Sequence, residues 1–124
     1  MRRGLLALLI EDSDDTREMY ATLLVLEGFV VEEARDGQEG LQKAGEHLPD
    51  IIVTDLAMPL MDGWEMIRRL KADERTRQIP IIACSGEEAP RGARYLAADV
   101  ILPKPCALDL LLIEIRRLLL RRAA

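Results

Sequence analysis

Acidic, hydroxyl and basic side chains stand at the ends of several short apolar runs in this sequence of 124 residues. Glu11 and Asp12 follow one run, and Asp55 follows another. Ser85 follows a third run, and Lys104 comes two residues after a fourth. If the three carboxylates meet, they repel one another and their pKa values rise unless a cation joins them. The cluster therefore predicts a hard divalent ion with oxygen ligands, and Mg²⁺ is the natural candidate.

The same residue types could support phosphoryl transfer. A carboxylate can attack a phosphorus atom and form an acyl phosphate, and Asp55 is best placed to do so because it follows the most buried of the predicted strands. Lys104 would supply a compact positive charge to the phosphoryl oxygens, and the Ser85 hydroxyl would donate a hydrogen bond to another of them. We therefore expect Asp55 to be the residue that reacts.

The apolar runs that precede these residues predict buried strands. Each is too short for a helix and is continuous, as in strands covered on both faces. The runs are Leu5–Ile10, Ile51–Val53, Ile79–Cys84 and Val100–Leu102. A further segment, Phe29–Ala34, contains two adjacent acids and predicts an edge strand.

Segments with a helical period separate the strands, and each is expected to bury one apolar stripe. The expected stripes are Met19, Leu23 and Leu26, then Leu41, Ala44 and Leu48, then Trp64, Ile67 and Leu70. Ser13 or Asp14 is placed to cap the first helix, and Gly28 to end it in a left-handed conformation. The last helix is expected from about Leu108 to Arg122.

Regular alternation of strands and helices predicts an α/β fold, with a doubly wound five-stranded parallel sheet and helices on both faces. The ligand site of such a sheet lies outside the carboxyl ends of its strands. This is where the acids, the hydroxyl and the lysine are expected to gather.

Composition limits the class of protein. A chain of this length with 49% hydrophobic residues fits one domain, spanning residues 1–124. A net charge of −5 opposes direct nucleic-acid binding. No apolar stretch approaches the ~20 residues of a membrane span. Two cysteines are too few for a secreted disulfide framework, so we expect a reducing, cytoplasmic setting.

Together with the segment Met58–Gly63 after the acid, these residues resemble the receiver domain of two-component response regulators over essentially the whole chain. The resemblance implies the flavodoxin-like strand order 2-1-3-4-5, with Asp55 as phosphoacceptor. It also implies Asp12 as a direct Mg²⁺ ligand, Glu11 as an acid acting mainly through water, and the backbone carbonyl of Ala57 as a further ligand.

The resemblance further implies a role for Ser85 as the switch hydroxyl, for Lys104 as the ion-pair partner of the phosphoryl group, and for a cis peptide between Lys104 and Pro105. A histidine kinase or a phosphotransfer protein would be the donor in the phosphorelay, and a downstream protein would bind the switched surface. The chain would then be a phosphoacceptor and not an enzyme with turnover.

Three features depart from the family pattern. Ile101 stands at the switch position where the family usually has Tyr or Phe, and its aliphatic side chain can pack there but offers no ring or hydroxyl to a partner. Pro90 and Gly92 disfavour helix, so the fourth helix is expected to be short or poorly ordered. Leucines and isoleucines cover more than one face of the last helix, which predicts a homodimer or partner interface through helix 4, strand 5 and helix 5.

Two other functions require residues that this sequence lacks, and a third stays open. A phosphatase of the haloacid-dehalogenase type needs a second acid two residues after the nucleophile, where this chain has Ala57. A flavodoxin-like cofactor binder needs a phosphate-cradling loop, and the acids between Glu11 and Asp15 would repel a phosphate. A pseudo-receiver scaffold that binds proteins without phosphorylation stays open.

His47 and the two cysteines also have simple structural interpretations. His47 lies in a polar turn far from the acids and is expected to be solvated surface. Cys84 and Cys106 could form a redox pair near the site, although a buried cysteine acting as a small hydrophobe is the commoner case.

Overall fold

Five short strands run parallel in one sheet within residues 4–58, 61–86 and 98–123, which are the residues that the computed structural model describes. The order across the sheet is β2-β1-β3-β4-β5, which confirms the expected fold class and strand order. The strands are β1 (Leu6–Ile10), β2 (Val30–Ala34), β3 (Ile51–Asp55), β4 (Ile81–Ser85) and β5 (Val100–Pro103). All five residues of β3 are buried, because neighbouring strands and helices cover this central strand on every side.

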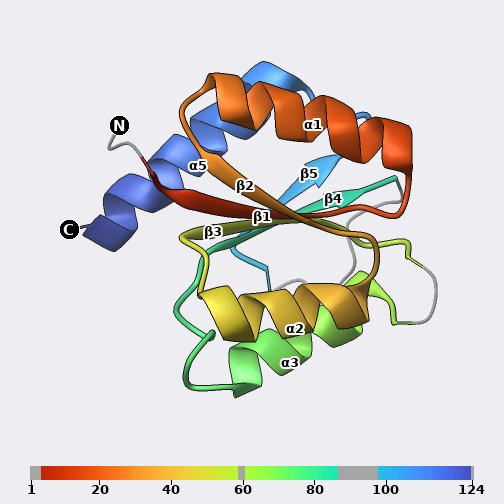
Figure 1. Cartoon of the computed structure of the whole chain (residues 1–124), viewed down its shortest axis with the longest axis vertical. Coiled ribbons are helices and arrows are strands. Elements are labelled where there is room, and N and C mark those ends of the chain that lie inside the picture. Colours follow the sequence, from red (N-terminus) through yellow and green to blue (C-terminus); the bar gives the residue numbers. More distant parts are fainter. Residues whose placement is uncertain (1–3, 59–60, 87–97, 124) are drawn as a thin grey trace.

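Helices cover both faces of the sheet, as predicted (Figure 1). The pair α1 and α5 lies on one face, and the pair α2 and α3 lies on the other. These helices are α1 (Asp14–Leu26), α2 (Gly37–His47), α3 (Gly63–Ala72) and α5 (Leu108–Ala123). The fourth helix expected around Pro90 and Gly92 lies outside the described residues. No helix in the described part of the chain is long and apolar enough to span a membrane.

Short polar side chains begin three of the helices. The N-caps are Ser13, Asp36 and Asp62, and each side-chain oxygen accepts the amide N–H three residues on, at 3.4, 2.8 and 2.8 Å respectively. Gly28 has a φ of +100° just after α1, so the helix ends in the left-handed region that glycine enters without steric cost. The predicted caps at Ser13 and Gly28 are confirmed.

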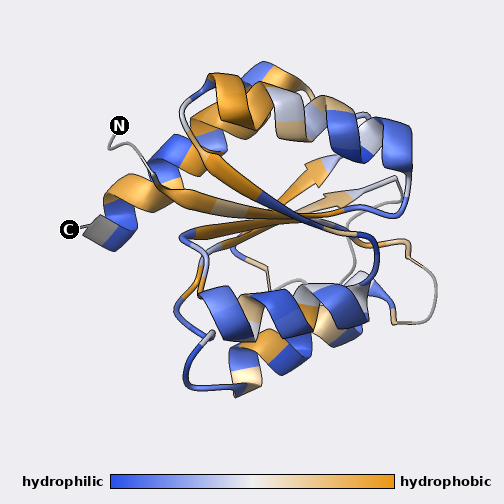
Figure 2. Ribbon diagram, viewed as in Figure 1, coloured by the Kyte–Doolittle hydropathy of each residue, from blue (hydrophilic) through white to orange (hydrophobic). Residues whose placement is uncertain are grey.

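The apolar core is divided by the sheet into two layers. Leu24 and Leu111 belong to the layer under α1 and α5, and Ala44 and Met66 belong to the layer under α2 and α3. Figure 2 shows the hydrophobic strands between helices whose outer faces are largely hydrophilic on the α2 and α3 side. The sheet is therefore buried on both faces, as its continuous apolar runs require.

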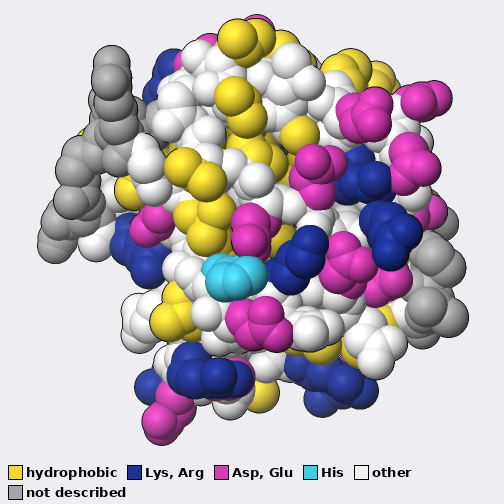
Figure 3. All heavy atoms as spheres, in the orientation of Figure 1, with side chains coloured by type: hydrophobic (Ala, Val, Ile, Leu, Met, Phe, Trp, Pro, Cys, Tyr) yellow, Lys and Arg dark blue, Asp and Glu magenta, His cyan; other side chains and the backbone are white. Residues whose placement is uncertain are grey.

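The stripe predicted for α1 is wrong. Met19 and Leu26 are 51% and 76% exposed, whereas Arg17, Ala21 and Leu24 face the sheet. Figure 3 shows exposed apolar side chains over this helix. The hydrophobic pattern excluded Arg17 from the stripe, but Arg17 is buried because its charge is neutralised by Asp14, three residues earlier in α1, and by Glu33 of β2.

The other two stripes are largely confirmed. Ala44 is buried and Leu41 half-buried, but Leu48 is exposed because it forms the left-handed C-cap of α2 with a φ of 46°. In α3, Ile67 and Leu70 are buried and Trp64 is half-buried.

Candidate functional site

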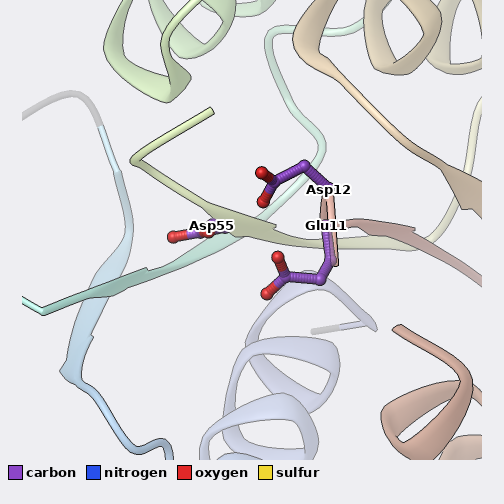
Figure 4. Close-up of side chains that lie close together, drawn as sticks. All are labelled: Glu11, Asp12 and Asp55. Carbon is purple, nitrogen blue, oxygen red and sulfur yellow. The ribbon is translucent and has the colours of Figure 1, made fainter. Parts of the chain in front are cut away.

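The three acids meet at the carboxyl edge of the sheet. Ile10 of β1 pairs in register with Thr54 of β3, so the residues that follow each strand are neighbours in space. One oxygen each of Glu11, Asp12 and Asp55 lies within 4.8 Å of the others. Figure 4 shows the Glu11 and Asp12 carboxylates reaching from the end of β1 toward Asp55 at the end of β3.

Local structure restrains the connection that carries two of these acids. The Glu11 amide donates to the carbonyl of Ala34 at 3.0 Å, which continues the β1–β2 pairing past the strand. The Ser13 amide donates to the Glu11 carboxylate at 3.1 Å, and Ser13 then caps α1. The two acids therefore occupy a short turn between a paired strand and a capped helix.

Lys104, which directly follows the edge strand β5, also reaches the carboxylate of Asp55. Its Nζ lies 2.7 Å from Asp55 Oδ1, and the side chain of Asp55 is only 4% exposed against 35% for Lys104. The Lys104 amide donates to the carbonyl of Ser85 at 2.8 Å. The Lys104–Pro105 peptide is cis, as the family resemblance implied.

Two ionisable groups show the electrostatic cost of this arrangement. Burial is the main cause that raises the pKa of Glu11 to about 7. The hydrogen bond with Asp12 and the charge of Asp55 also act to raise this pKa, whereas the hydrogen bond from the Ser13 amide and the charge of Lys104 act to lower it. Burial acts to lower the pKa of Lys104, but its hydrogen bond to Asp55 and the charges of Asp55 and Glu11 outweigh burial and raise it. The cluster thus holds more negative charge than one lysine neutralises.

The remaining predicted residues surround the acceptor. The Ala57 amide donates to Asp55 Oδ1 at 3.3 Å, and Ala57 is exposed at the mouth of the site. Ser85 ends β4 and is partly exposed. Ile101 pairs with Ala83 across β4 and β5 and packs, half-buried, against the core layer under α2 and α3.

A cavity of about 660 Å³ opens beside Asp55 and extends between α1 and the start of α5. Its far wall includes Pro105 and Cys106 together with residues that the sequence analysis did not assign to the site: Thr16, Met19, Tyr20 and Leu111. The Tyr20 hydroxyl donates to the carbonyl of Cys106 at 3.0 Å and joins the two sides of this wall. The hydrophobic period of one segment does not predict this wall, because its residues, such as Tyr20 and Cys106, are far apart in the chain.

The donor set fits a hard divalent cation. Three carboxylates converge, and burial together with the neighbouring acids raises the pKa of Glu11, so added positive charge would favour its ionised form. Carboxylate oxygens, with a backbone carbonyl and water, are the ligands that Mg²⁺ takes in proteins. Glu11, Asp12 and Asp55 are the residues that would hold such an ion.

His47 was expected as solvated surface in a turn, and the two cysteines as buried small hydrophobes or a redox pair. The surface position of His47 is confirmed, although the residue ends α2 instead of lying in a turn. His47 is exposed on α2, with Nδ1 2.7 Å from a carboxylate oxygen of Glu32, away from the acids. Cys84 and Cys106 are both buried, unpaired by disulfide, and part of the core layer under α1 and α5.

Fold and site together define an α/β protein with a carboxylate cluster, a lysine and a hydroxyl at the carboxyl edge of a 2-1-3-4-5 sheet. Residues 7–116 match the family model described as the response regulator receiver domain. The chain belongs to this family, whose members act in two-component systems.

Individual relatives agree. The response regulator MprA of Mycobacterium leprae (strain TN) is 37% identical over 115 residues, which are 92% of this chain and 50% of that protein. The chemotaxis response regulator CheY4 of Vibrio cholerae is 30% identical with a TM-score of 0.84, and the match covers 93% of this chain and 98% of that one.

A third relative bears on the acidic cluster. The receiver domain of the sensor histidine kinase PA1611 from Pseudomonas aeruginosa PAO1 is 28% identical, with a TM-score of 0.84 over 94% of this chain and 98% of that one. Its structure has a magnesium ion coordinated in the active site cleft. The chain spans half or less of the length of the curated relatives it matches.

Proposed function

We propose that Asp55 accepts a phosphoryl group from the phosphohistidine of a histidine kinase or a phosphotransfer protein, and that the phosphorylated chain binds a downstream protein. The observation that carries this proposal is the placement of one buried carboxylate, that of Asp55, 2.7 Å from the Lys104 ammonium and beside Glu11 and Asp12. The adjoining cavity leaves room for a donor group at the same edge of the sheet.

The chemistry follows from these positions. A carboxylate oxygen of Asp55 attacks the phosphorus atom, a P–O bond forms, and the P–N bond to the donor histidine breaks, which leaves the histidine with the electron pair. Lys104 already contacts Asp55 and can follow the phosphoryl oxygens as negative charge moves outward. A bound Mg²⁺ would neutralise charge on the phosphoryl oxygens.

We infer that Ser85 and Ile101 convert this event into a surface change. Ser85 ends β4, and Ala83 of that strand pairs with Ile101, so Ser85 and Ile101 belong to the same face of the sheet. A Ser85 hydroxyl drawn toward the phosphoryl group would leave space that the Ile101 side chain can enter. Added charge of about −2 supplies the bias for such a two-state change.

The dimer surface that we propose includes α5 and β5, with the helix 4 segment that lies outside the described residues. Leu110, Ile113 and Leu120 of α5 are 39%, 57% and 73% exposed, although a helix on one sheet needs only a single apolar stripe. A second copy of this chain is the occupant that we propose for this face, in a symmetric homodimer. The chain would act in the cytoplasm and would gain and lose its own phosphoryl group without turnover of a substrate.

Acetyl phosphate with Mg²⁺ tests the central step. Intact-mass measurement should show the gain of one phosphoryl group, which peptide mapping places on Asp55, and the gain should disappear in chelator. The Asp55→Asn variant should gain nothing, since an amide is a poor nucleophile. Asp15→Asn is the matched control, because Asp15 is an exposed acid in the first turn of α1 and should leave phosphorylation unchanged.

The same experiment separates the rival functions. A chain that takes no phosphoryl group from acetyl phosphate or from a phosphorylated histidine protein would be a pseudo-receiver scaffold, and the proposal would fail. Sustained release of phosphate from many equivalents of a phosphomonoester, which lacks the reactive bond of acetyl phosphate or phosphohistidine, would instead indicate a phosphatase.

A further inference from the structure

An arginine lies buried behind the acidic cluster. Arg17 is only 9% exposed and occupies the sheet-facing side of α1. Buried arginines are rare unless their charge is paired, so its surroundings need an explanation. Arg17 does not line the cavity beside Asp55, and a direct contact with a phosphoryl group in that cavity is therefore not its role.

The guanidinium group joins three parts of the fold. Nη1 donates to the backbone carbonyl of Glu11 at 2.9 Å, Nη2 donates to Asp14 at 2.6 Å, and Nε donates to Glu33 at 3.2 Å. Glu11 belongs to the connection after β1, Asp14 begins α1, and Glu33 lies in β2. The hydrogen bond to Asp14, with the pairing to Glu33, raises the pKa of Arg17 despite burial, so the group stays charged.

These contacts fix the backbone of Glu11 from both sides. Its N–H donates to Ala34 at 3.0 Å, and its C=O accepts from Arg17, so both polar groups of this peptide segment are bonded to other elements. A hydrogen bond from a guanidinium in a buried setting is stronger than one between neutral groups. The turn that carries Glu11 and Asp12 therefore has few alternative conformations.

Such restraint matters because the acids repel one another. Carboxylates within 4.8 Å gain free energy by separating when no cation is present, and a free turn would let Glu11 and Asp12 move away from Asp55. A cation would then have to reassemble its ligands at the cost of ordering the turn. A turn already held in place avoids that cost.

We propose that Arg17 is a positioning residue for the divalent-cation site, acting through the backbone of Glu11. This inference rests on the proposed function, because it takes the acidic cluster to be the cation site. Asp14 and Glu33 neutralise the guanidinium, so Arg17 holds the turn without adding net positive charge that would repel the ion. Its contribution is geometric.

Calorimetric titration of the metal-free full chain with Mg²⁺ tests the inference by a readout other than phosphorylation. Arg17→Met keeps the apolar stem and loses all three hydrogen bonds, and the Kd for Mg²⁺ should rise about tenfold or more, as for other residues that orient metal ligands. Arg17→Lys should restore only part of the affinity, because one ammonium cannot reach three partners in a fork. Arg75→Met removes a surface arginine paired with Asp73 and should leave the Kd unchanged.

A second variant covers the case in which Arg17→Met does not fold. Glu33→Gln weakens the anchor to β2 and leaves the contact to Glu11 available, so the Kd should rise several-fold in a chain with native circular dichroism. Amide hydrogen exchange of Glu11 and Ser13 should also accelerate in the Arg17 or Glu33 variant that folds.

The outcomes are distinct. If the unmodified chain binds Mg²⁺ and the folded Arg17 or Glu33 variants bind it equally well, the inference is wrong and the proposed function stands. If the Arg75 control loses as much affinity as Arg17→Met, the effect is general and the inference is again wrong. A chain that binds no Mg²⁺ at all refutes both proposals.

Discussion

Replacing Lys104 by methionine should destabilise the metal-free protein through the acceptor carboxylate. The Lys104 ammonium lies 2.7 Å from Asp55, whose side chain is 4% exposed. Methionine keeps the length and apolar character of the stem, so the change removes the charge with little loss of packing. Asp55 would then be a buried carboxylate whose lysine partner is gone, while Glu11 and Asp12 still repel it.

The expected cost lies between two reference cases. Breaking a fully buried ion pair costs roughly 3–5 kcal/mol, and an exposed pair contributes roughly 0.2–1 kcal/mol. Asp55 is buried but Lys104 is 35% exposed, so we expect the free energy of unfolding to fall by about 2 kcal/mol. With an unfolding entropy of about 2.1 cal/mol/K per residue, the thermal midpoint of this domain should fall by about 8 °C.

A double-mutant cycle measured by urea denaturation in chelator isolates the pair. Lys104→Met should cost about 2 kcal/mol in the unmodified chain and well under ~1 kcal/mol in the Asp55→Asn background, where no carboxylate is left unpaired. Mg²⁺ should narrow the difference between the unmodified chain and the Lys104 variant, since the ion replaces the missing positive charge. Equal costs of Lys104→Met in both backgrounds would refute the argument, because the lysine would then act through packing alone.

Two further outcomes are expected. Because the pKa of Glu11 is raised from 4.5 to about 7 in the folded protein, the folded state holds a proton that the unfolded chain has lost, and the free energy of unfolding in chelator should fall as pH rises through this range. Glu11→Gln should flatten that part of the profile, and an unchanged slope would contradict the assignment. Ile113→Glu should abolish any dimer seen by light scattering with a beryllium fluoride mimic, whereas Thr22→Glu on exposed α1 should not; a chain that is monomeric with and without the mimic counts against the α5 interface.

Much of the site followed from the sequence because one geometric rule determines it. Short continuous apolar runs specify parallel strands, and parallel strands bring their carboxyl ends to the same edge. Asp55 directly ends β3, and Glu11 and Asp12 directly follow β1, so their convergence needs only the strand order. Lys104 and Asp55 are 2.7 Å apart for the same reason, although many residues separate them in the chain.

The buried faces of the helices were predicted less completely from the sequence. The rotation of a helix about its axis depends on the elements it packs against as well as on its hydrophobic period. The stripe predicted for α3 was right, because the apolar residues Ile67 and Leu70 lie on one side of the helix and both are buried. The α1 stripe was wrong, since a hydrophobic pattern gives no reason to turn Arg17 inward and leave Met19 exposed. The physical reason is that a buried charge is tolerated only where it is paired, and two of the three partners of Arg17, Glu33 and the carbonyl of Glu11, come from outside α1.

By itself, the sequence determined the strands and the acids, hydroxyl and lysine at their ends, because apolar runs and short-range capping depend on adjacent residues. The order of the strands across the sheet was implied only by the family resemblance. Only the tertiary structure decided that Arg17 holds the Glu11 carbonyl and that Tyr20 bonds to the Cys106 carbonyl beside the cavity. Those contacts join groups from different elements, and their free energy depends on distances that no periodicity in one segment encodes.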